Sequence, residues 1–350
     1  MNELRVGIIG LGRVSQHYLK LYESGKLPKI RFVACYDSNA SALQDFSSQS
    51  GIKAFDTAQD LINSTDVDAI FVLTPSGNHF EIASQTLAGG KPTLIEKPLC
   101  LRVDQAFELL NLAKINGVYL QSILQNRYNE AVQEFLALKS RKAFNVIISA
   151  GLRLRWGRKS AYYEDGWHGT WEMDGGVVSQ QAIHHIFALD QLVGPISSIH
   201  TYSYNRKHLN MQAEDTVVGT GITIDGVPLT IELTTAAPER DFEACISVLT
   251  DKGVFEIGGI ALNTLKFESS EGGGPKIIVD EFVPTGYGWG HITEISIFAE
   301  MVLSERPLIS LDDSIRALRL VHAIYCSIET KSSILLADSP QSSLLGIGIK

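Results

Sequence analysis

The fold is decided near the N-terminus by residues 7–15, which read GIIGLGRVS. Gly10, Gly12 and Ser15 occupy the three small-residue positions of a G-x-G-x-x-G turn, with Ser in place of the last Gly. Gly10 permits the tight turn, Gly12 lets a pyrophosphate approach the backbone, and the third position needs a small side chain where helix and strand pack. The motif predicts a strand, a turn and a helix that bind a dinucleotide. The alternative is a glycine turn that only packing requires.

The helix after this turn supplies N–H groups and the positive end of a dipole, which suit phosphates. We therefore expect Arg13 and Val14 among the cofactor contacts; a P-loop is excluded because they stand where Lys and Ser or Thr would be. Asp37 closes the second expected strand, where a carboxylate binds the ribose hydroxyls of the adenosine. Because this charge would repel a 2′-phosphate, the sequence predicts NAD rather than NADP. The alternative for Asp37 is an N-cap of the helix expected from Ala40.

The first 125 residues alternate apolar strands with amphipathic helices. We expect helices over 40–50 and 103–116, and strands over 5–9, 31–36, 52–55, 69–74, 93–96 and 118–124. Apolar strands that alternate with helices indicate a parallel sheet covered on both faces. The sequence therefore predicts an α/β protein whose residues 1–125 form a Rossmann NAD-binding domain.

The pattern changes after residue 125. Residues 126–350 are expected to form an α+β substrate-binding and oligomerisation domain with a large, mostly antiparallel, open-faced sheet. Its helices are predicted near 129–138, 177–192 and 312–330, and its strands include 216–224, 228–235, 244–250 and 253–257. A broad sheet face of this kind is usually buried against another subunit, so we expect a homodimer or homotetramer.

The composition excludes several classes of protein. The 350 residues suggest about two domains, and 30 Lys and Arg against 39 Asp and Glu give a net charge of −9, which argues against nucleic-acid binding. No apolar run approaches the roughly 18 residues of a membrane helix, and no signal peptide is expected, so we predict a cytoplasmic protein without a membrane partner. No metal is expected, because the sequence has no H-E-x-x-H motif and its cysteines have no metal spacing; they are Cys35, Cys100, Cys245 and Cys326.

Two expected strands end in polar residues, where open α/β sheets bind ligands. The first ends at Thr74, followed by Pro75 and, a few residues on, His79. The second ends in Glu96-Lys97-Pro98. A Lys directly after a buried strand is a candidate for proton transfer, and an ordinary surface Lys is the alternative.

Taken in order, these motifs and the later segment Gly175-Gly176…His184 resemble the Gfo/Idh/MocA oxidoreductase family over roughly residues 4–336. The resemblance implies an NAD-dependent dehydrogenase that acts on CH–OH groups, with Lys97 as the catalytic residue. It also implies that the cofactor contacts include Thr74, Pro75, His79, Glu96 and Lys97.

The family carries an Asp and a His four residues apart in its substrate domain, and here Gln180 stands in the Asp position before His184. An amide cannot transfer protons as a carboxylate does, so Lys97 and His184 are expected to do the proton work while Gln180 hydrogen-bonds the substrate. On a continuous helix Gln180 and His184 would share one face, and His185 would point elsewhere, as a supporting or interface residue. Gln180 also leaves open a cofactor-sensing regulatory protein that has lost turnover.

Residues 152–159 alternate apolar and basic side chains, so that Arg153 and Arg155 share one face of a strand. They could attract an anionic substrate, or they could pair with acids on a solvated or interface strand. Aromatic residues follow, among them Tyr163 and Trp167, whose ring faces suit sugars and nucleobases.

This second half resembles the sugar-nucleotide dehydrogenases that oxidise carbon 3 of UDP-N-acetylglucosaminuronate for surface-polysaccharide amino sugars. The resemblance implies an anionic sugar nucleotide as the substrate, and a free sugar, inositol or other cyclic polyol is the alternative. The substrate contacts it implies are Arg127, Tyr128, Arg155, Tyr163, Trp167, Gln180 and His184.

Overall fold

The computed structural model describes residues 3–304 and 310–347. They form two compact units, one from the described parts of Met1–Ile123 and His291–Ile315, the other from those of Leu124–Gly290 and Arg316–Lys350. The first boundary lies two residues from the expected cut after residue 125. The sequence did not predict that residues 291–304 and 310–315, well inside the expected second domain, belong to the first unit. In the described ranges, no helix is both long enough and apolar enough to cross a bilayer.

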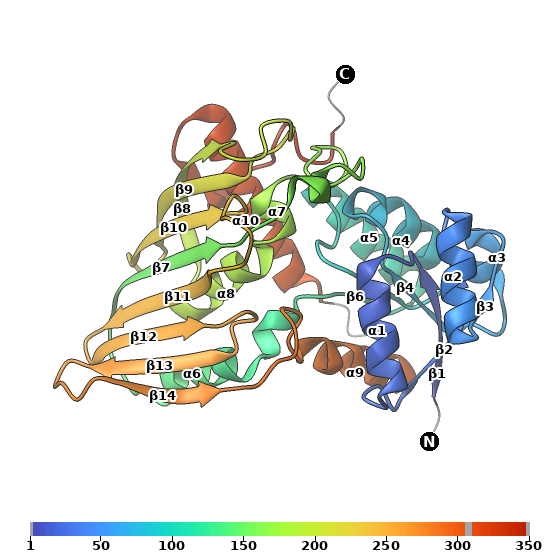
Figure 1. Ribbon diagram of the computed structural model, residues 1–350, viewed down its shortest axis with the longest axis horizontal. Coiled ribbons are helices and arrows are strands. Elements are labelled where there is room, and N and C mark those ends of the chain that lie inside the picture. Colours follow the sequence, from blue (N-terminus) through green and yellow to red (C-terminus); the bar gives the residue numbers. More distant parts are fainter. Residues whose placement is uncertain (1–2, 305–309, 348–350) are drawn as a thin grey trace. The chain divides into compact units, whose positions relative to one another are not determined.

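The first unit contains a six-stranded parallel sheet in the order β3-β2-β1-β4-β5-β6 (Figure 1). This order confirms the predicted Rossmann fold. Successive strands are added on one side of β1 and then, from β4 onward, on its other side, and such sheets bind ligands beside the point where this order reverses. The strands are β1 (Leu4–Ile9), β2 (Ile30–Tyr36), β3 (Lys53–Ala54), β4 (Ala69–Val72), β5 (Thr93–Ile95) and β6 (Leu120–Ser122).

Local sequence sets the ends of the helices in this unit. Asn39 caps the N-terminus of α2 by accepting from the N–H groups of Ser41 and Ala42, and Gly51 ends the helix in the left-handed conformation. The helices expected over 40–50 and 103–116 are present with those bounds. The α-helices of the unit are α1 (Arg13–Glu23), α2 (Ala40–Ser50), α3 (Ala58–Asn63), α4 (His79–Ala88) and α5 (Val103–Asn116), and a 3-10 turn, η1, covers Ser76–Asn78.

Most of α9 (Gly290–Leu303) belongs to this first unit and is anchored there by buried polar groups. Gln121 on β6 donates to the Glu294 carboxylate at 2.6 Å, and Glu294 is completely buried. A buried carboxylate without a hydrogen-bond donor would be costly, so this contact specifies where the helix docks.

The second unit is built on a nine-stranded sheet in the order β14-β13-β12-β11-β7-β10-β9-β8-β15. Only β10 and β7 pair in parallel; the other pairs are antiparallel, as expected. The strands are β7 (Ile147–Arg155), β8 (Ile196–Tyr204), β9 (Thr216–Thr223), β10 (Pro228–Thr234), β11 (Glu243–Thr250), β12 (Gly253–Gly258), β13 (Thr264–Ser269), β14 (Pro275–Asp280) and β15 (Ile334–Leu335).

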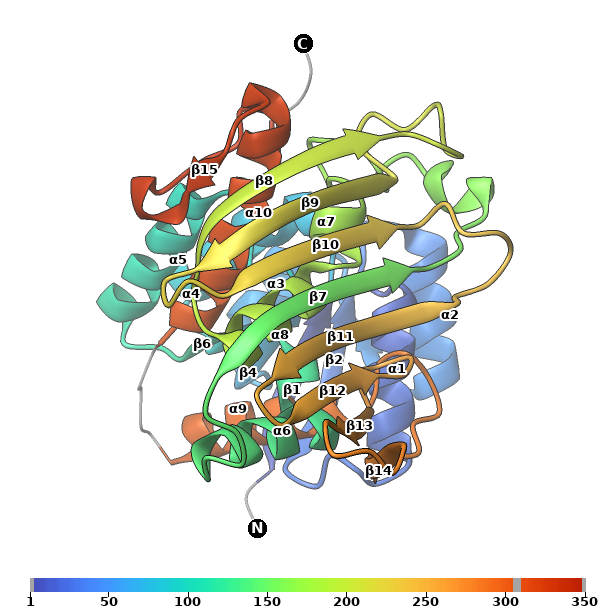
Figure 2. The ribbon, with the colours of Figure 1, turned by 90° about the vertical axis from the view of Figure 1, so that its left-hand side faces the viewer.

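Helices cover one face of this sheet (Figure 2). On β7 the buried residues Ala150, Leu152 and Leu154 alternate with Gly151, Arg153 and Arg155, so one face is apolar and the other meets solvent. α8 packs on β7 and β11. The helices of the unit are α6 (Glu130–Ser140), α7 (Val177–Gln180), α8 (Ile183–Val193) and all but the first turn of α10 (Asp312–Thr330), which confirms the helix expected over 312–330. Its 3-10 turns are η2 (Gln125–Tyr128), η3 (Ser160–Tyr163) and η4 (Leu336–Asp338).

The helix expected over residues 177–192 is broken in two. The N–H of Ala182 donates to the carbonyl of Val177, five residues earlier, at 2.9 Å, which widens the turn and ends α7 at Gln180. A new helix, α8, begins at Ile183. Gln180 and His184 therefore lie on two successive helices, and the expectation that they share one continuous helix face is wrong.

Candidate active site

The glycine turn has the geometry that its sequence predicts. Gly10 has φ +98°, and a Cβ there would lie 2.6 Å from the backbone of Leu73, so only glycine fits. A Cβ at Gly12 would meet no atom within 4 Å, which leaves the backbone open to a ligand. Ser15 is buried and donates to the Gly12 carbonyl at 2.6 Å, so the serine keeps the turn closed in place of the third glycine.

The N-terminus of α1 has no side-chain cap and no acidic residue in its first turn. Its leading N–H groups, including those of Arg13 and Val14, suit an anion such as a pyrophosphate. The predicted cofactor contacts Arg13 and Val14 are therefore the first two residues of this helix.

Asp37 lies directly after β2, half-buried beside the glycine turn. Its Oδ2 accepts the N–H of Leu11 at 2.7 Å and its Oδ1 accepts the N–H of Asn39 at 2.8 Å. Because Asn39 is the residue that caps α2, the alternative of Asp37 as the helix cap does not hold. The carboxylate is fixed at the strand end where a ribose is expected.

Thr74 and Pro75 follow β4 at the same edge of the sheet. The Thr74 Oγ1 is buried and has no hydrogen-bond partner within the part of the chain that the structure describes. A buried hydroxyl without a partner is unusual and suits a polar group of a ligand. Together with the open backbone at Gly12, it fits a nicotinamide dinucleotide laid along this edge.

Glu96 holds the turn that carries Lys97. Its Oε2 accepts the Lys97 N–H at 3.0 Å, and its Oε1 accepts the Tyr18 hydroxyl at 2.7 Å and faces the His291 Nε2 at 3.3 Å. Burial raises the pKa of Glu96, but the hydrogen bond and charge of His291 and the Tyr18 hydroxyl outweigh it and hold that pKa at about 2. Glu96 is thus a buried carboxylate with protein partners on both oxygens, instead of the predicted cofactor contact, and the Lys97 side chain is half-buried.

His79 is also buried, with protein partners on both ring nitrogens. Its Nδ1 lies 2.7 Å from the carbonyl of Pro98, and its Nε2 lies 2.9 Å from the carbonyl of Thr74. Its side chain is 1% exposed. These partners connect the turns that follow β4 and β5, and the cofactor contact of His79 stays a prediction.

In the second unit, Gln180 ends α7 and is half-buried, and His184 lies in the first turn of α8 and is buried. His185 packs edge-on against Trp156 at 5.3 Å between ring centroids. Burial lowers the pKa of His185 to about 4. His185 is therefore a neutral core residue, in keeping with the expectation that it supports the helix rather than meets the substrate.

The start of α7 is fixed by Glu214, a residue that the sequence reasoning missed. The Glu214 Oε1 accepts the N–H of Val178 at 3.1 Å and the Tyr325 hydroxyl at 3.1 Å, and that hydroxyl accepts the N–H of Gly176. Burial raises the pKa of Glu214 to about 7. A buried acid that titrates near neutral pH therefore stands at the base of the helix that carries Gln180.

The other predicted substrate contacts lie on two 3-10 turns and the loop after one of them. Arg127 stacks over the Tyr128 ring in η2, at 4.9 Å from its centroid. Tyr163 in η3 bonds the Thr235 hydroxyl at 2.9 Å, and Trp167 stacks on His168 at 3.5 Å between centroids. These four side chains, of Arg127, Tyr128, Tyr163 and Trp167, are half-buried and lie outside the hydrophobic core.

Arg155 has partners other than a substrate. It forms a bidentate pair with Glu232, at 2.7 and 2.9 Å, and also reaches Glu243. Arg153 pairs with Glu243 at 2.9 Å, and Arg158 pairs with Asp241 at 2.8 Å. Of the two interpretations of the basic strand, acid pairing is the one the structure shows. The assignment of Arg155 to the substrate is corrected, because it lies on the sheet face opposite α8.

Tertiary contacts supply the groups that sequence reasoning missed: Tyr18 and His291 around Glu96, and Glu214 and Tyr325 below α7. His291 is 195 residues from Glu96, and no local pattern links them. Glu214 and Asp215 are two adjacent acids just before a strand, a pattern that could have marked them. Within the described ranges, His, Cys, Asp and Glu side chains form no group of three that could hold a metal ion.

Comparison with known proteins places both halves of the chain in one family. Residues 4–123 match the model of an oxidoreductase family with an NAD-binding Rossmann fold, and residues 146–256 match the GFO/IDH/MocA C-terminal domain. The chain is 31% identical over 121 residues to the rhizopine catabolism protein MocA of Rhizobium meliloti, and 32% identical over 128 residues to inositol 2-dehydrogenase of Gluconacetobacter diazotrophicus. Each alignment covers 35% of this chain and 37% of the relative, so the chain spans little more than a third of the length of these curated relatives.

A solved structure matches nearly the whole chain. It is the WlbA dehydrogenase from Bordetella pertussis in complex with NADH and UDP-GlcNAcA, with 26% identity and a TM-score of 0.81 over 96% of this chain and 98% of that one. The chain belongs to the Gfo/Idh/MocA family of oxidoreductases and carries that family's NAD-binding Rossmann domain.

Proposed function

We propose that the protein is an NAD-dependent dehydrogenase that oxidises or reduces a sugar carbon bearing a hydroxyl group. The observation that carries the proposal is the arrangement at one edge of the Rossmann sheet. The open glycine turn, the fixed carboxylate of Asp37, the buried hydroxyl of Thr74 and the Lys97 turn all follow strands of that sheet. Ligands of such sheets bind at this edge.

Each residue of the proposed site is assigned one role, in binding NAD, in moving a proton or in orienting the substrate. The first turn of α1 holds the pyrophosphate, Asp37 holds the adenosine ribose, and Thr74 with Pro75 borders the nicotinamide end. The bound NAD supplies the hydride acceptor or donor. Lys97 accepts the proton of the substrate hydroxyl in oxidation and returns it in reduction, so charge and hydrogen both balance. His184 assists with this proton, and Gln180 donates a hydrogen bond that orients the substrate.

The substrate class that we favour is a sugar nucleotide. Similarity over nearly the whole chain to a dehydrogenase crystallised with UDP-GlcNAcA supports this choice. The aromatic groups Tyr163 and Trp167 suit a sugar ring or a base. The basic strand does not add support, because its arginines are already paired with acids.

A dehydrogenase of a free sugar, inositol or other cyclic polyol is the second candidate. The 32% identity to an inositol 2-dehydrogenase favours it. That alignment covers only 35% of the chain, which is less than the extent of the match to the sugar-nucleotide enzyme. A regulatory protein that binds NAD without turnover is the third candidate. It is suggested by Gln180, because the amide cannot transfer a proton as the family's Asp does.

A panel of substrates separates the three candidates. Purified protein is mixed with NAD and, in turn, with UDP-sugars, free sugars and inositols, and NADH formation is followed by absorbance. We expect turnover with an acidic UDP-sugar, and a loss of about 10²–10⁴-fold in the Lys97→Ala variant with NAD binding retained. Lys53→Ala, an exposed lysine on β3, is the control and should leave turnover unchanged. Activity only on free polyols would replace the sugar nucleotide, and NAD binding without any turnover would favour the regulatory protein.

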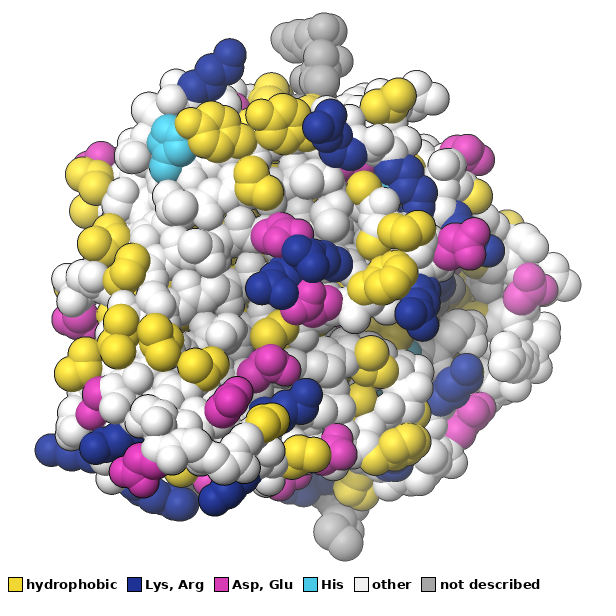
Figure 3. All heavy atoms as spheres, turned by 60° about the vertical axis from the view of Figure 1, so that its left-hand side comes forward, with side chains coloured by type: hydrophobic (Ala, Val, Ile, Leu, Met, Phe, Trp, Pro, Cys, Tyr) yellow, Lys and Arg dark blue, Asp and Glu magenta, His cyan; other side chains and the backbone are white. Residues whose placement is uncertain are grey.

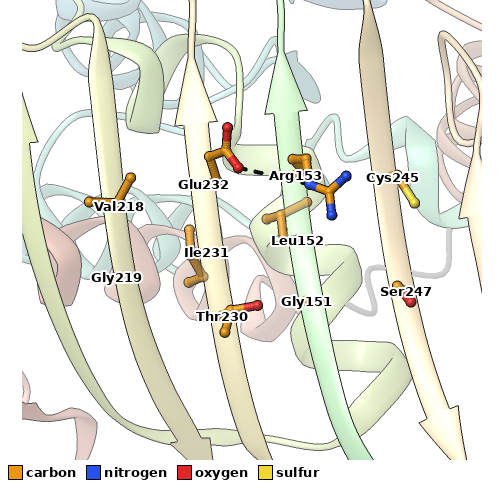
Figure 4. A pocket seen from close by; sticks show the side chains of 10 residues that line it. All are labelled: Gly151, Leu152, Arg153, Val218, Gly219, Thr230, Ile231, Glu232, Cys245 and Ser247. Carbon is orange, nitrogen blue, oxygen red and sulfur yellow. Dashed lines mark ion pairs between the residues drawn. The ribbon is translucent and has the colours of Figure 1, made fainter.

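We further propose that a second copy of the chain covers the open face of the nine-stranded sheet. Positive and negative side chains adjoin in the middle of this face among small polar ones (Figure 3). They surround a hollow of about 320 Å³ that Arg153, Glu232, Cys245 and Ser247 help to line (Figure 4). Exposed apolar side chains lie on the same face, at Tyr202, Val218, Ile222 and Leu249.

This face carries both arginines and glutamates. In a two-fold contact between two copies, the arginines of one copy could therefore face the glutamates of the other. A homodimer, or a homotetramer built from it, follows from this proposal. We also propose a cytoplasmic location, in keeping with four cysteines that are all free thiols.

A further inference from the structure

His79 makes an unusual pair of contacts for a buried histidine. Its Nδ1 and Nε2 face the carbonyl oxygens of Pro98 and Thr74, at 2.7 and 2.9 Å. A carbonyl oxygen only accepts hydrogen bonds, so each ring nitrogen must donate. A neutral imidazole has a single N–H and would leave a lone pair against one of these oxygens. Both contacts are satisfied together only in the imidazolium form.

The two carbonyls belong to the turns that matter most in the proposed function. Thr74 follows β4, and its buried hydroxyl is the group without a described partner. Pro98 follows Lys97 on the turn after β5. The strands β4 and β5 are neighbours in the sheet, but their regular pairing stops at Val72 and Ile95, before either turn. His79 therefore connects the two turns beyond the point where the regular pairing of β4 with β5 ends.

We propose that His79 is a positioning residue that ties the Lys97 turn to the end of β4 by donating from both ring nitrogens. Only the expected effect of His79 on turnover rests on the proposed function. The tie itself is a property of the Rossmann unit. It differs from the role of a cofactor ligand, because the ring is 1% exposed and both of its nitrogens already have partners.

The charged groups around His79 act on it in both directions. Burial lowers the pKa of His79, and the positive charge of Lys97 acts in the same sense. The carbonyls of Pro98 and Thr74 and the negative charge of Glu96 oppose that shift without cancelling it, so the pKa of His79 lies below its usual value of 6.5. The tie is complete while the ring keeps both protons, and one of its two bonds is lost as the pH rises and the ring becomes neutral.

The protonation state of His79 is the direct test. Full-length protein labelled with ¹⁵N-histidine is examined by NMR with and without NAD, and the His79 signals are assigned by their loss in His79→Gln. We expect both ring nitrogens to be protonated at the acid end of the pH range and the ring to lose a proton as the pH rises, together with a fall in kcat. A His79 ring that is a neutral tautomer throughout the pH range of activity would overturn the proposal.

Kinetics of His79→Gln test the positioning role. One amide nitrogen cannot span both carbonyls, so kcat should fall by about 10–100-fold, the loss expected from a displacement of about 1 Å, while the Kd for NAD changes less than about threefold. His322→Gln is the matched control: His322 is equally buried but lies in the second unit, where its Nδ1 accepts the N–H of Ser342. It should alter stability and leave the pH profile of kcat unchanged.

Failure of the His79 proposal can be distinguished from failure of the proposed dehydrogenase function. A chain with no dehydrogenase activity on any substrate would defeat that function, yet the ¹⁵N signals would still decide whether His79 donates twice. An active enzyme whose kcat is the same in His79→Gln would defeat the positioning role alone.

Discussion

Asp37 fixes the glycine turn, because its two oxygens accept N–H groups from Leu11 and Asn39, and we propose that the same carboxylate binds the adenosine ribose of NAD. Asp37→Ala should weaken NAD binding by about 2–4 kcal/mol, less where water substitutes, and should relax the discrimination against NADP. Asp37→Asn keeps an acceptor oxygen for the turn and removes only the charge, so it should relax the discrimination with a smaller loss of NAD affinity.

Titration of both cofactors into each variant by calorimetry measures these effects. Asp45→Ala, on the exposed surface of α2, is the control. A wild-type protein that prefers NADP would show that the role of Asp37 has been misjudged.

Substitutions of Gln180 test whether this residue orients the substrate or stands in place of a catalytic acid that the protein has lost. If it only orients the substrate, Gln180→Ala should raise KM with a small effect on kcat. Gln180→Asp should be neutral or harmful, because a partly buried carboxylate carries a desolvation cost. Steady-state kinetics of both variants provide the measurement. A large rise in kcat for Gln180→Asp would instead describe the natural protein as a disabled member of its family and would move the regulatory function ahead of the enzymatic one.

At the scale of the element, α7 depends on a buried acid for its position. Glu214 accepts the N–H of Val178, and its Oε2 has no partner among the described residues, so its ionised form is poorly satisfied. Burial raises its pKa from 4.5 to about 7. The folded state therefore holds this proton more tightly than the unfolded state, and the stabilisation is complete below pH 4.5 and is lost as the pH rises through about 7.

Urea unfolding at pH 5 and pH 8 tests this dependence. The free energy of unfolding of the wild type, relative to that of Glu214→Gln, should fall by up to about 3 kcal/mol between the two values, since each pKa unit corresponds to about 1.4 kcal/mol. Glu172→Gln, an exposed carboxyl, should follow the wild type. Identical pH dependence in the wild type and Glu214→Gln would rule out the titration of Glu214 in this range.

At the scale of the whole molecule, we propose that the open face of the nine-stranded sheet forms the contact between two copies of the chain. Val218 stands next to Glu232 on this face and is 40% exposed. Val218→Arg places a long charged side chain on each side of the proposed two-fold contact and should raise the dissociation constant of the dimer at least about tenfold. Sedimentation velocity over a range of concentrations measures the change.

Ile115→Arg is the matched control, because Ile115 is 72% exposed on α5, a helix of the first unit. It should leave the association unchanged. A wild-type chain that is monomeric at micromolar concentration, or a Val218→Arg variant that still associates fully, would place the interface elsewhere or exclude it.

Short-range physics made much of this protein predictable from its sequence. The glycine turn, the alternation of strands with helices and the Glu96-Lys97-Pro98 turn depend on residues within a few positions of one another. Helix 40–50 is bounded by Asn39 and Gly51, whose cap conformations are local properties. The Rossmann fold, the antiparallel sheet and the family followed from these patterns.

Tertiary structure alone decided which polar groups meet. Arg155 looked like an anion site until the sheet register set Glu243 opposite it and brought Glu232 within 2.7 Å. His291 reached Glu96 only because α9 returns to the first unit across nearly two hundred residues. The break after Gln180 depends on a widened turn above the buried Glu214. A charge or a hydrogen bond in a folded protein is satisfied by whatever lies nearest in space, and sequence periodicity carries no record of such distant partners.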